Sequence, residues 1–345
     1  MSILLAGCGT PGAPQPPSLQ LPQPVGDLRA VRQGDKVMLT WTAPKETTDR
    51  GGIRGAATAR VCRGYRAQAE VCKDAVGDVP SDPGKKTSFT DDLTAVLRNP
   101  VQDSVTYNVE VLNDRGRSAG PSNGATIFLA PGMAAAQNVA ARLERAGILI
   151  EFGGAAPPAS TSLPANYFYR VMRRPALPGE GEVGETIVGE APARPGMASV
   201  RDRNFLWERR YLYRVAGITQ VLSRDGKILA EFEGQAAAPA EVNARDVFAP
   251  GRPQGLQAVY SGIETQRSID LTWTPGEDAD LAGYHVYRRE GSSGNVRANP
   301  ELVQTPSYRD ANVLPGNTYV YSVTAVDTRG NESPASAPAD EKVPE

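Results

Sequence analysis

The sequence predicts an all-β protein in which three sandwich domains follow one another along the chain. Two observations support this fold class: one series of strand-like landmarks recurs three times, and glycine and proline are frequent, at 35 and 29 of 345 residues. Frequent glycine and proline without a short period favour many turns over long helices. The length suits two or three domains, since a domain takes roughly 100–200 residues.

The first two landmarks of each repeat are typical of neighbouring β-strands. One alternates apolar and other residues and ends in a large aromatic residue, as a half-buried strand does. The other places apolar residues before an arginine. The pairs are VMLTW (37–41) with RVCR (60–63), ILIEF (148–152) with YRVMRR (169–174), and IDLTW (269–273) with YHVYRR (284–289).

The third and fourth landmarks follow in the same order each time. One reads Ser-apolar-x-Asp, and the other is a tyrosine followed by apolar residues at alternate positions. Four landmarks in one order, three times, predict a tandem array of three β domains. The third landmark occupies 88–91, 199–202 and 307–310, and the fourth is expected to align Tyr107, Tyr211 and Tyr319.

The last repeat resembles a bacterial fibronectin type III domain over essentially all of residues 250–340. The resemblance depends on Trp273, the YHVYR segment and LPGNTYVYSVTAVD (314–327). It implies three tandem immunoglobulin-like (fibronectin type III) β-sandwiches, in which this tryptophan fills the space between the sheets. It also implies a tyrosine corner, where Tyr319 bonds to the backbone just upstream. The core aromatic residues expected across the repeats are Trp41, Phe152, Trp273, Tyr107, Tyr211 and Tyr319.

The first two repeats carry insertions relative to the third, at 47–58, 62–86 and 173–197. Surface loops are where binding residues most often lie, so these segments are candidate binding sites, with neutral drift as the alternative. Cys62 and Cys72 lie in one of them. Cys62 points away from Val61 and out of the core, and a hairpin would bring Cys72 opposite it. We expect a disulfide in an oxidising compartment, or two free thiols in a cytosolic protein.

The N-terminus resembles a bacterial lipoprotein processing site. Leu5, Ala6 and Gly7 before Cys8 match the lipobox, which implies diacylglycerol on the Cys8 sulfur, cleavage after Gly7 and acylation of the new amine. Only seven uncharged residues precede Cys8, too few for a secretory signal, so we interpret residues 1–7 as a signal-peptide remnant with the start upstream. The Pro-rich residues 8–22 predict an extended tether.

The predicted organisation is therefore a remnant (1–7), a lipidated tether (8–22) and three domains (23–131, 132–248 and 249–345). We expect a non-catalytic lipoprotein of the bacterial cell envelope, on the outer membrane because Gly9 and not Asp follows the cysteine. Its sandwiches would act as a spacer and as a module that binds a protein or a glycan. The alternative is an accessory subunit of an envelope secretion or polysaccharide-handling complex.

Other functions find little support in the sequence. His285 is the single histidine, so a Ser-His-Asp triad would have to include it and a metal site with several histidines is not possible. Its position in the third repeat predicts a surface residue of a sheet. Glu277, Asp278 and Asp280 lack the spacing of a calcium loop, so we expect no metal and no cofactor. A net charge of −2 gives no indication of a nucleic-acid partner. The sequence contains no run of about 18–20 apolar residues, so it predicts no transmembrane helix.

Overall fold

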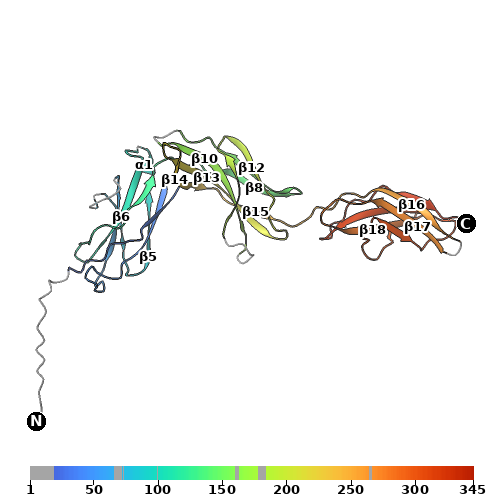
Figure 1. The fold of residues 1–345 in the computed structure, drawn as a ribbon, viewed down its shortest axis with the longest axis horizontal. Helices are drawn as coiled ribbons and strands as arrows, with labels where there is room; N and C mark the ends of the chain where they lie inside the picture. Colours follow the sequence, from blue (N-terminus) through green and yellow to red (C-terminus); the bar gives the residue numbers. More distant parts are fainter. Residues whose placement is uncertain are drawn as a thin grey trace, which may run out of the picture. The chain divides into compact units, whose positions relative to one another are not determined.

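The computed structural model describes residues 19–65, 72, 74–98, 100–159, 163–177, 184–263 and 266–345 (Figure 1). Strands make up almost all of the regular structure in these residues, and they form three sandwiches as predicted. The backbone divides into two compact units. One contains the first two sandwiches, and the other contains the third sandwich together with Leu206–Arg209.

The first sandwich packs a three-stranded layer against a four-stranded sheet. Its elements are β1 (Arg29–Gln33), β2 (Lys36–Thr42), β3 (Thr58–Gly64), β4 (Ala75–Pro80), β5 (Lys86–Asp92), α1 (Thr94–Arg98), β6 (Ser104–Leu112) and β7 (Ala125–Phe128). The layer has the order β1-β2-β5 and the sheet the order β4-β3-β6-β7. Alternation along β2 directs Val37, Leu39 and Trp41 into the core, as its period of two predicts.

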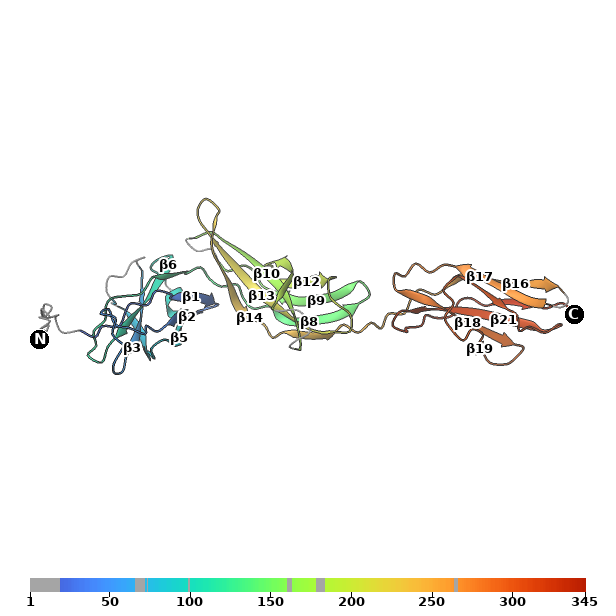
Figure 2. The same cartoon turned by 60° about the horizontal axis from the view of Figure 1, so that its bottom comes forward.

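The second sandwich has the same two layers with longer strands (Figure 2). Its strands are β8 (Gln137–Glu144), β9 (Gly147–Gly154), β10 (Ala165–Pro175), β11 (Thr186–Pro192), β12 (Gly196–Asp202), β13 (Arg210–Leu222), β14 (Ile228–Ala236) and β15 (Ala240–Asn243). One layer has the order β12-β9-β8. The other has the order β11-β10-β13-β14, with β15 also paired to β13.

The third sandwich repeats the arrangement with the shortest connections. Its strands are β16 (Gln254–Ile263), β17 (Gln266–Thr274), β18 (Leu281–Glu290), β19 (Val296–Arg297), β20 (Ser307–Asp310), β21 (Thr318–Asp327) and β22 (Ala339–Lys342). The two sheets have the orders β16-β17-β20 and β19-β18-β21-β22.

Each sandwich buries the large aromatic residue near the end of its second strand. Trp41, Phe152 and Trp273 are 2%, 0% and 5% exposed. The ring of Phe152 packs edge-on against Tyr169 with centroids 5.2 Å apart, and Trp273 packs in the same way against Tyr284 at 5.1 Å. Edge-to-face pairs are a favoured aromatic geometry. These residues fill the space between the sheets, as the sequence predicts.

The tyrosine alignment needs one correction. Tyr319 forms the expected corner, because its hydroxyl accepts a hydrogen bond from the Leu314 N–H at 2.9 Å. The expected match of Tyr107 with Tyr319, however, is wrong by two residues, and Val105 occupies the equivalent place. The pairing of strands shows this shift. The equivalent arginine of each sandwich lies opposite one tyrosine on the neighbouring strand, and the three pairs are Arg63 with Tyr107, Arg173 with Tyr213 and Arg288 with Tyr321.

An Arg–Asp–Tyr cluster connects the two sheets in every sandwich, with the aspartate and tyrosine buried in all three and the arginine buried in the second. In the second, Arg173 Nη1 and the Tyr213 hydroxyl each donate to Asp202 Oδ2 at 2.8 Å. The aspartate comes from one sheet, and the arginine and tyrosine come from the other. The equivalent clusters are Arg63–Asp91–Tyr107, with donor distances of 2.6 and 2.6 Å, and Arg288–Asp310–Tyr321, with 2.8 and 2.9 Å.

These clusters predict loss of stability at alkaline pH. Burial first, and the aspartate second, raise the pKa of Tyr107, Tyr213 and Tyr321 above the ordinary value of 10.0. Above that pH the unfolded chain releases protons that the folded chain retains. The free energy of unfolding should therefore be unaffected by these tyrosines below pH 10 and fall above it, by about 1.4 kcal/mol per pH unit for each one.

Urea denaturation at pH 9 and pH 11 measures this fall. Tyr321→Phe removes the ionisable hydroxyl of the cluster in the third sandwich. The free energy of unfolding of this sandwich should then fall less between the two pH values. A third sandwich whose stability is equal at both pH values before the substitution would contradict the expectation.

The first two sandwiches are joined by a strand contact and a small apolar cluster. The edge strand β1 pairs in parallel with β14, and the Gly34 N–H donates to the Glu233 carbonyl at 2.7 Å. Ala130, Val221 and Phe232 form a buried cluster beside this contact. These contacts make the first two sandwiches one compact unit, which the sequence did not predict.

Arg32 lies buried within this junction, with 5% of its surface exposed. Its Nη1 donates to the Phe128 carbonyl at 2.5 Å and its Nε to the Gly34 carbonyl at 2.8 Å. The guanidinium stacks on the Phe232 ring, 4.0 Å from the centroid. Burial lowers the pKa of Arg32 to about 10. The arginine therefore connects the end of the first sandwich to a strand of the second.

Gly234→Ala tests this junction. A Cβ at Gly234 would lie 2.0 Å from the Met133 carbonyl oxygen, so the backbone has to shift. We expect the free energy of unfolding of the two-sandwich unit to fall by about 2 kcal/mol, measured by urea denaturation. Gly26→Ala is the matched control, because a Cβ there meets nothing within 4 Å. Equal stability of the two variants would contradict the expectation.

The first sandwich begins earlier than the predicted boundary at residue 23. Asn113 Nδ2 lies 3.2 Å from the Leu19 carbonyl oxygen and donates to it, and the Thr48 N–H donates to the Leu21 carbonyl at 2.9 Å. The Gln23 N–H donates to the Glu46 carbonyl at 3.0 Å. Residues 19–22 thus belong to the packed domain and not to the tether.

Candidate functional site: the disulfide and loop end of the first sandwich

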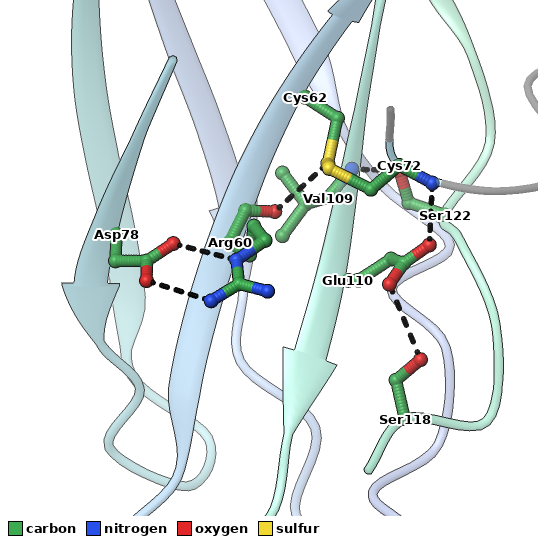
Figure 3. The surroundings of a disulfide bond; sticks show 8 residues. All are labelled: Arg60, Cys62, Cys72, Asp78, Val109, Glu110, Ser118 and Ser122. Atoms are coloured by element: carbon green, nitrogen blue, oxygen red, sulfur yellow. Dashed lines mark hydrogen bonds and ion pairs between the residues drawn. A yellow bond between two sulfur atoms is a disulfide. The ribbon is translucent and has the colours of Figure 1, made fainter. Parts of the chain in front are cut away.

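A disulfide joins Cys62 on β3 to Cys72, the pair for which the sequence predicts a bridge. Their Cα atoms are 5.4 Å apart, an ordinary separation for a disulfide. Cys62 is buried but lies outside the core cluster that contains its neighbour Val61. The bridge therefore lies outside the core and spans only the first part of the insertion, from residue 62 to residue 72 (Figure 3).

Polar contacts from β6 hold the second cysteine in place. The Cys72 N–H donates to Glu110 Oε1 at 3.2 Å, and the Ser118 hydroxyl donates to the other carboxylate oxygen at 3.4 Å (Figure 3). Across the sheet, Arg60 makes two hydrogen bonds of 3.1 Å to Asp78. The hydrogen bond to Asp78, and then its charge, raise the pKa of Arg60. The cysteine is thus held beside a row of charged side chains.

The inserted segments contain strands as well as loops. The insertion at 62–86 includes β4, and the one at 173–197 includes β11, whereas the third sandwich has only the two-residue β19 at this place. Much of the extra length therefore extends a sheet. Aligning the three repeats could not distinguish these added strands from loops, because the third repeat has no long strand at this place with which to align them.

The remaining insertion, 47–58, forms an ordered loop at the end where the chain enters the first sandwich. Thr47 is fully buried, and its hydroxyl accepts from the Gly51 N–H at 3.1 Å. A Cβ at Gly55 would lie 3.4 Å from a carboxylate oxygen of Asp114, which places this loop against the 113–118 loop. Two loops from distant parts of the sequence thus form one surface.

Leu5, Ala6, Gly7 and Cys8 lie outside the described residues. Among the described residues, no helix is long and apolar enough to cross a bilayer. His285 lies on β18 with its ring packed edge-on against Tyr287 at 6.4 Å, and it is half-buried on the outer face, as predicted.

The acidic segment before β18 takes part in a cluster that the sequence did not reveal. Asp280 lies with Asp246 and Asp327, and one carboxylate oxygen of each lies within 4.8 Å of the others. Burial raises the pKa of Asp327, but hydrogen bonds from Asn331 and from the backbone N–H groups of Arg329 and Gly330 outweigh it and hold this pKa below its usual range. Arg329 lies 3.3 Å from Asp246 and partly neutralises the cluster.

Comparison with known proteins identifies the class of domain. Residues 251–342 match the family model of the fibronectin type III domain. The third sandwich is therefore a fibronectin type III domain, and it belongs to an all-β chain whose other two sandwiches have a similar arrangement of strands. This agrees with the resemblance drawn from Trp273 and Tyr319.

Curated relatives share only a segment of about one domain. Amylopullulanase of Thermoanaerobacterium thermosulfurigenes is 34% identical over 91 residues, which is 26% of this chain and 5% of that protein. Exoglucanase B of Cellulomonas fimi is 37% identical over 95 residues, 27% and 8% respectively. Poly(3-hydroxybutyrate) depolymerase of Ralstonia pickettii is 34% identical over 85 residues, 25% and 15%. The chain thus spans a small fraction of the length of these relatives.

Two solved structures are also similar. The chicken CNTN1 FN1–FN3 domains are 16% identical with a TM-score of 0.27, covering 94% of this chain and 100% of that one. An Fn3-like protein from Clostridium thermocellum is 30% identical with a TM-score of 0.24, covering 28% of this chain and 97% of that one.

Proposed function

We propose that this chain is a non-catalytic lipoprotein of the bacterial cell envelope, anchored by lipid on Cys8. Its sandwiches act as a spacer, and its loops bind a protein or a glycan of the envelope. The outer membrane is the proposed location. Several acyl chains on one cysteine would give stable anchoring where a single chain is marginal.

The observation that carries this proposal is the disulfide between Cys62 and Cys72. Disulfides persist in oxidising compartments and are rare in the cytosol. The bridge therefore supports export of the chain, which a lipobox requires. With these two cysteines paired, Cys8 is the one remaining cysteine of the three in the sequence.

The relatives support a module without chemistry of its own. They bear the names of enzymes that differ in substrate, yet each shares with this chain a segment of about one domain. A segment found in enzymes with different names is more simply explained as a spacer or binding module than as the seat of a reaction. Function in such scaffolds lies in the loops that they present.

Incorporation of radiolabelled palmitate in cells tests the anchor. We expect label on the wild type and on the Cys62→Ser/Cys72→Ser variant, and none on Cys8→Ala. Only the Cys8→Ala chain should leave the membrane fraction after a salt wash. Label that survives in Cys8→Ala, or an unlabelled wild type, would refute the anchor.

A further inference from the structure

The chain enters the first sandwich between two loops, and these loops carry a group of exposed arginines. Residues 19–23 are hydrogen-bonded to Asn113 on one side and to residues 46–48 on the other. The two loops, 43–57 and 113–118, therefore surround the point at which a tether from Cys8 reaches the domain. Their exposed arginines are Arg50, Arg54, Arg115 and Arg117.

These four arginines are not engaged in ion pairs. Among the described residues, none of the four is within ion-pair distance of a carboxylate, whereas several arginines of the sheets are paired with acidic side chains, among them Arg60, Arg170 and Arg214. The loops 43–57 and 113–118 together contain five basic and three acidic residues, so this end is positive in a chain whose net charge is −2. An unpaired arginine presents donors in a geometry that suits phosphate.

The length of the preceding chain limits how far this end can lie from an anchor at Cys8. Ten residues separate Cys8 from Leu19, and a chain spans at most about 3.6 Å per residue, so the separation is at most about 40 Å. The loop end is therefore the part of the described chain that is held nearest to the lipid. Attraction between basic residues and an anionic surface acts within a Debye length, about 8–10 Å.

We propose that the loops 43–57 and 113–118 bind the anionic lipid headgroups of the membrane in which Cys8 is anchored. This inference rests on the proposed lipid anchor. The four arginines contact headgroup phosphates, and the first sandwich stands with its loop end on the membrane. The tether supplies a high local concentration, so that a moderate positive charge is enough for contact.

The test replaces the natural anchor by a chemical one. Because Cys62 and Cys72 are paired, the free thiol of Cys8 in the purified, unlipidated full chain couples to a maleimide headgroup lipid. Vesicles are prepared from phosphatidylcholine alone, or with about 30 mol% phosphatidylglycerol to give an anionic surface. Phenylglyoxal then modifies the accessible arginines, and mass spectrometry measures the modification rate of each one.

The loop arginines should react at least fivefold more slowly on the anionic vesicles than on the neutral ones, and high salt should remove this protection. Exposed arginines elsewhere in the same molecule serve as internal controls and should react equally on both. Equal rates for the loop arginines on the two vesicles, or protection no greater than that of the controls, would overturn the proposal. The controls are Arg203, Arg224 and Arg245.

Failure of this inference is distinguishable from failure of the anchor. The vesicle experiment attaches Cys8 chemically and is independent of acylation in cells. A labelled wild type with unprotected loop arginines leaves the anchor in place and removes the membrane contact. Protected loop arginines on a chain that incorporates no palmitate would show a lipid-binding surface without the proposed anchor.

Discussion

Asp202→Ala should lower the free energy of unfolding of the second sandwich by about 3–5 kcal/mol. Asp202 and Arg173 have side chains only 4% and 5% exposed, and they are 2.8 Å apart. Removing the carboxylate takes the balancing negative charge away from the buried guanidinium, which keeps its bond to the Asn204 carbonyl, and also deprives the Tyr213 hydroxyl of its acceptor. Leaving a buried charge uncompensated is among the most destabilising single changes.

An exposed pair of the same chemistry provides the control. Asp270 and Arg309 form an ion pair at 2.6 Å, but the arginine side chain is 68% exposed. Asp270→Ala should therefore cost less than about 1 kcal/mol. Urea denaturation of both variants measures the difference. A cost for Asp202→Ala no larger than that for Asp270→Ala would show that the buried cluster does not hold the two sheets together.

Cys62→Ser with Cys72→Ser should lower the stability of the first sandwich by about 2.7 kcal/mol, the chain-entropy value for a loop of this length. The bridge closes a loop between positions ten residues apart and connects it to the face of β3. Without the bridge, the unfolded chain gains conformational freedom, while the backbone N–H of residue 72 can still donate to Glu110.

Reductant distinguishes this effect from any cost of the serines. The wild type in dithiothreitol should unfold at the same urea concentration as the double variant, and the variant should not respond to dithiothreitol. A wild type whose urea midpoint is unchanged by reductant would contradict a stabilising bridge. The single variant Cys8→Ser is the control, because Cys8 takes no part in the bridge.

Local sequence patterns predicted the strands and core aromatic residues well, because the period of two that marks VMLTW or IDLTW also directs Trp41 and Trp273 inward. The pairing of distant residues was harder. Arginines and aspartates were visible as separate landmarks, but only the register between strands shows that Arg173 and Asp202 meet. The tyrosine alignment failed in the first repeat because a single tyrosine, Tyr107, had to be matched to one of two in the others.

Other features depend on contacts that no local pattern encodes. The pairing of β1 with β14 joins two domains through one strand edge, and nothing in either segment distinguishes it from a free edge. The Pro-rich composition extended the predicted tether to residue 22, whereas hydrogen bonds to Thr48 and Asn113 fix residues 19–22 on the sandwich. The insertion at 62–86 was recognised by length, but its division into strand and loop was not.

Mass spectrometry of the mature N-terminus tests the central claim of a lipid-anchored envelope protein most directly. The protein is extracted from membranes with detergent and digested with trypsin, which first cuts after Arg29. We predict an N-terminal peptide that begins at Cys8 and carries a diacylglyceryl group on sulfur and an acyl group on the amine. An N-terminal peptide that contains Met1–Gly7, or one with an unmodified Cys8, would contradict the account.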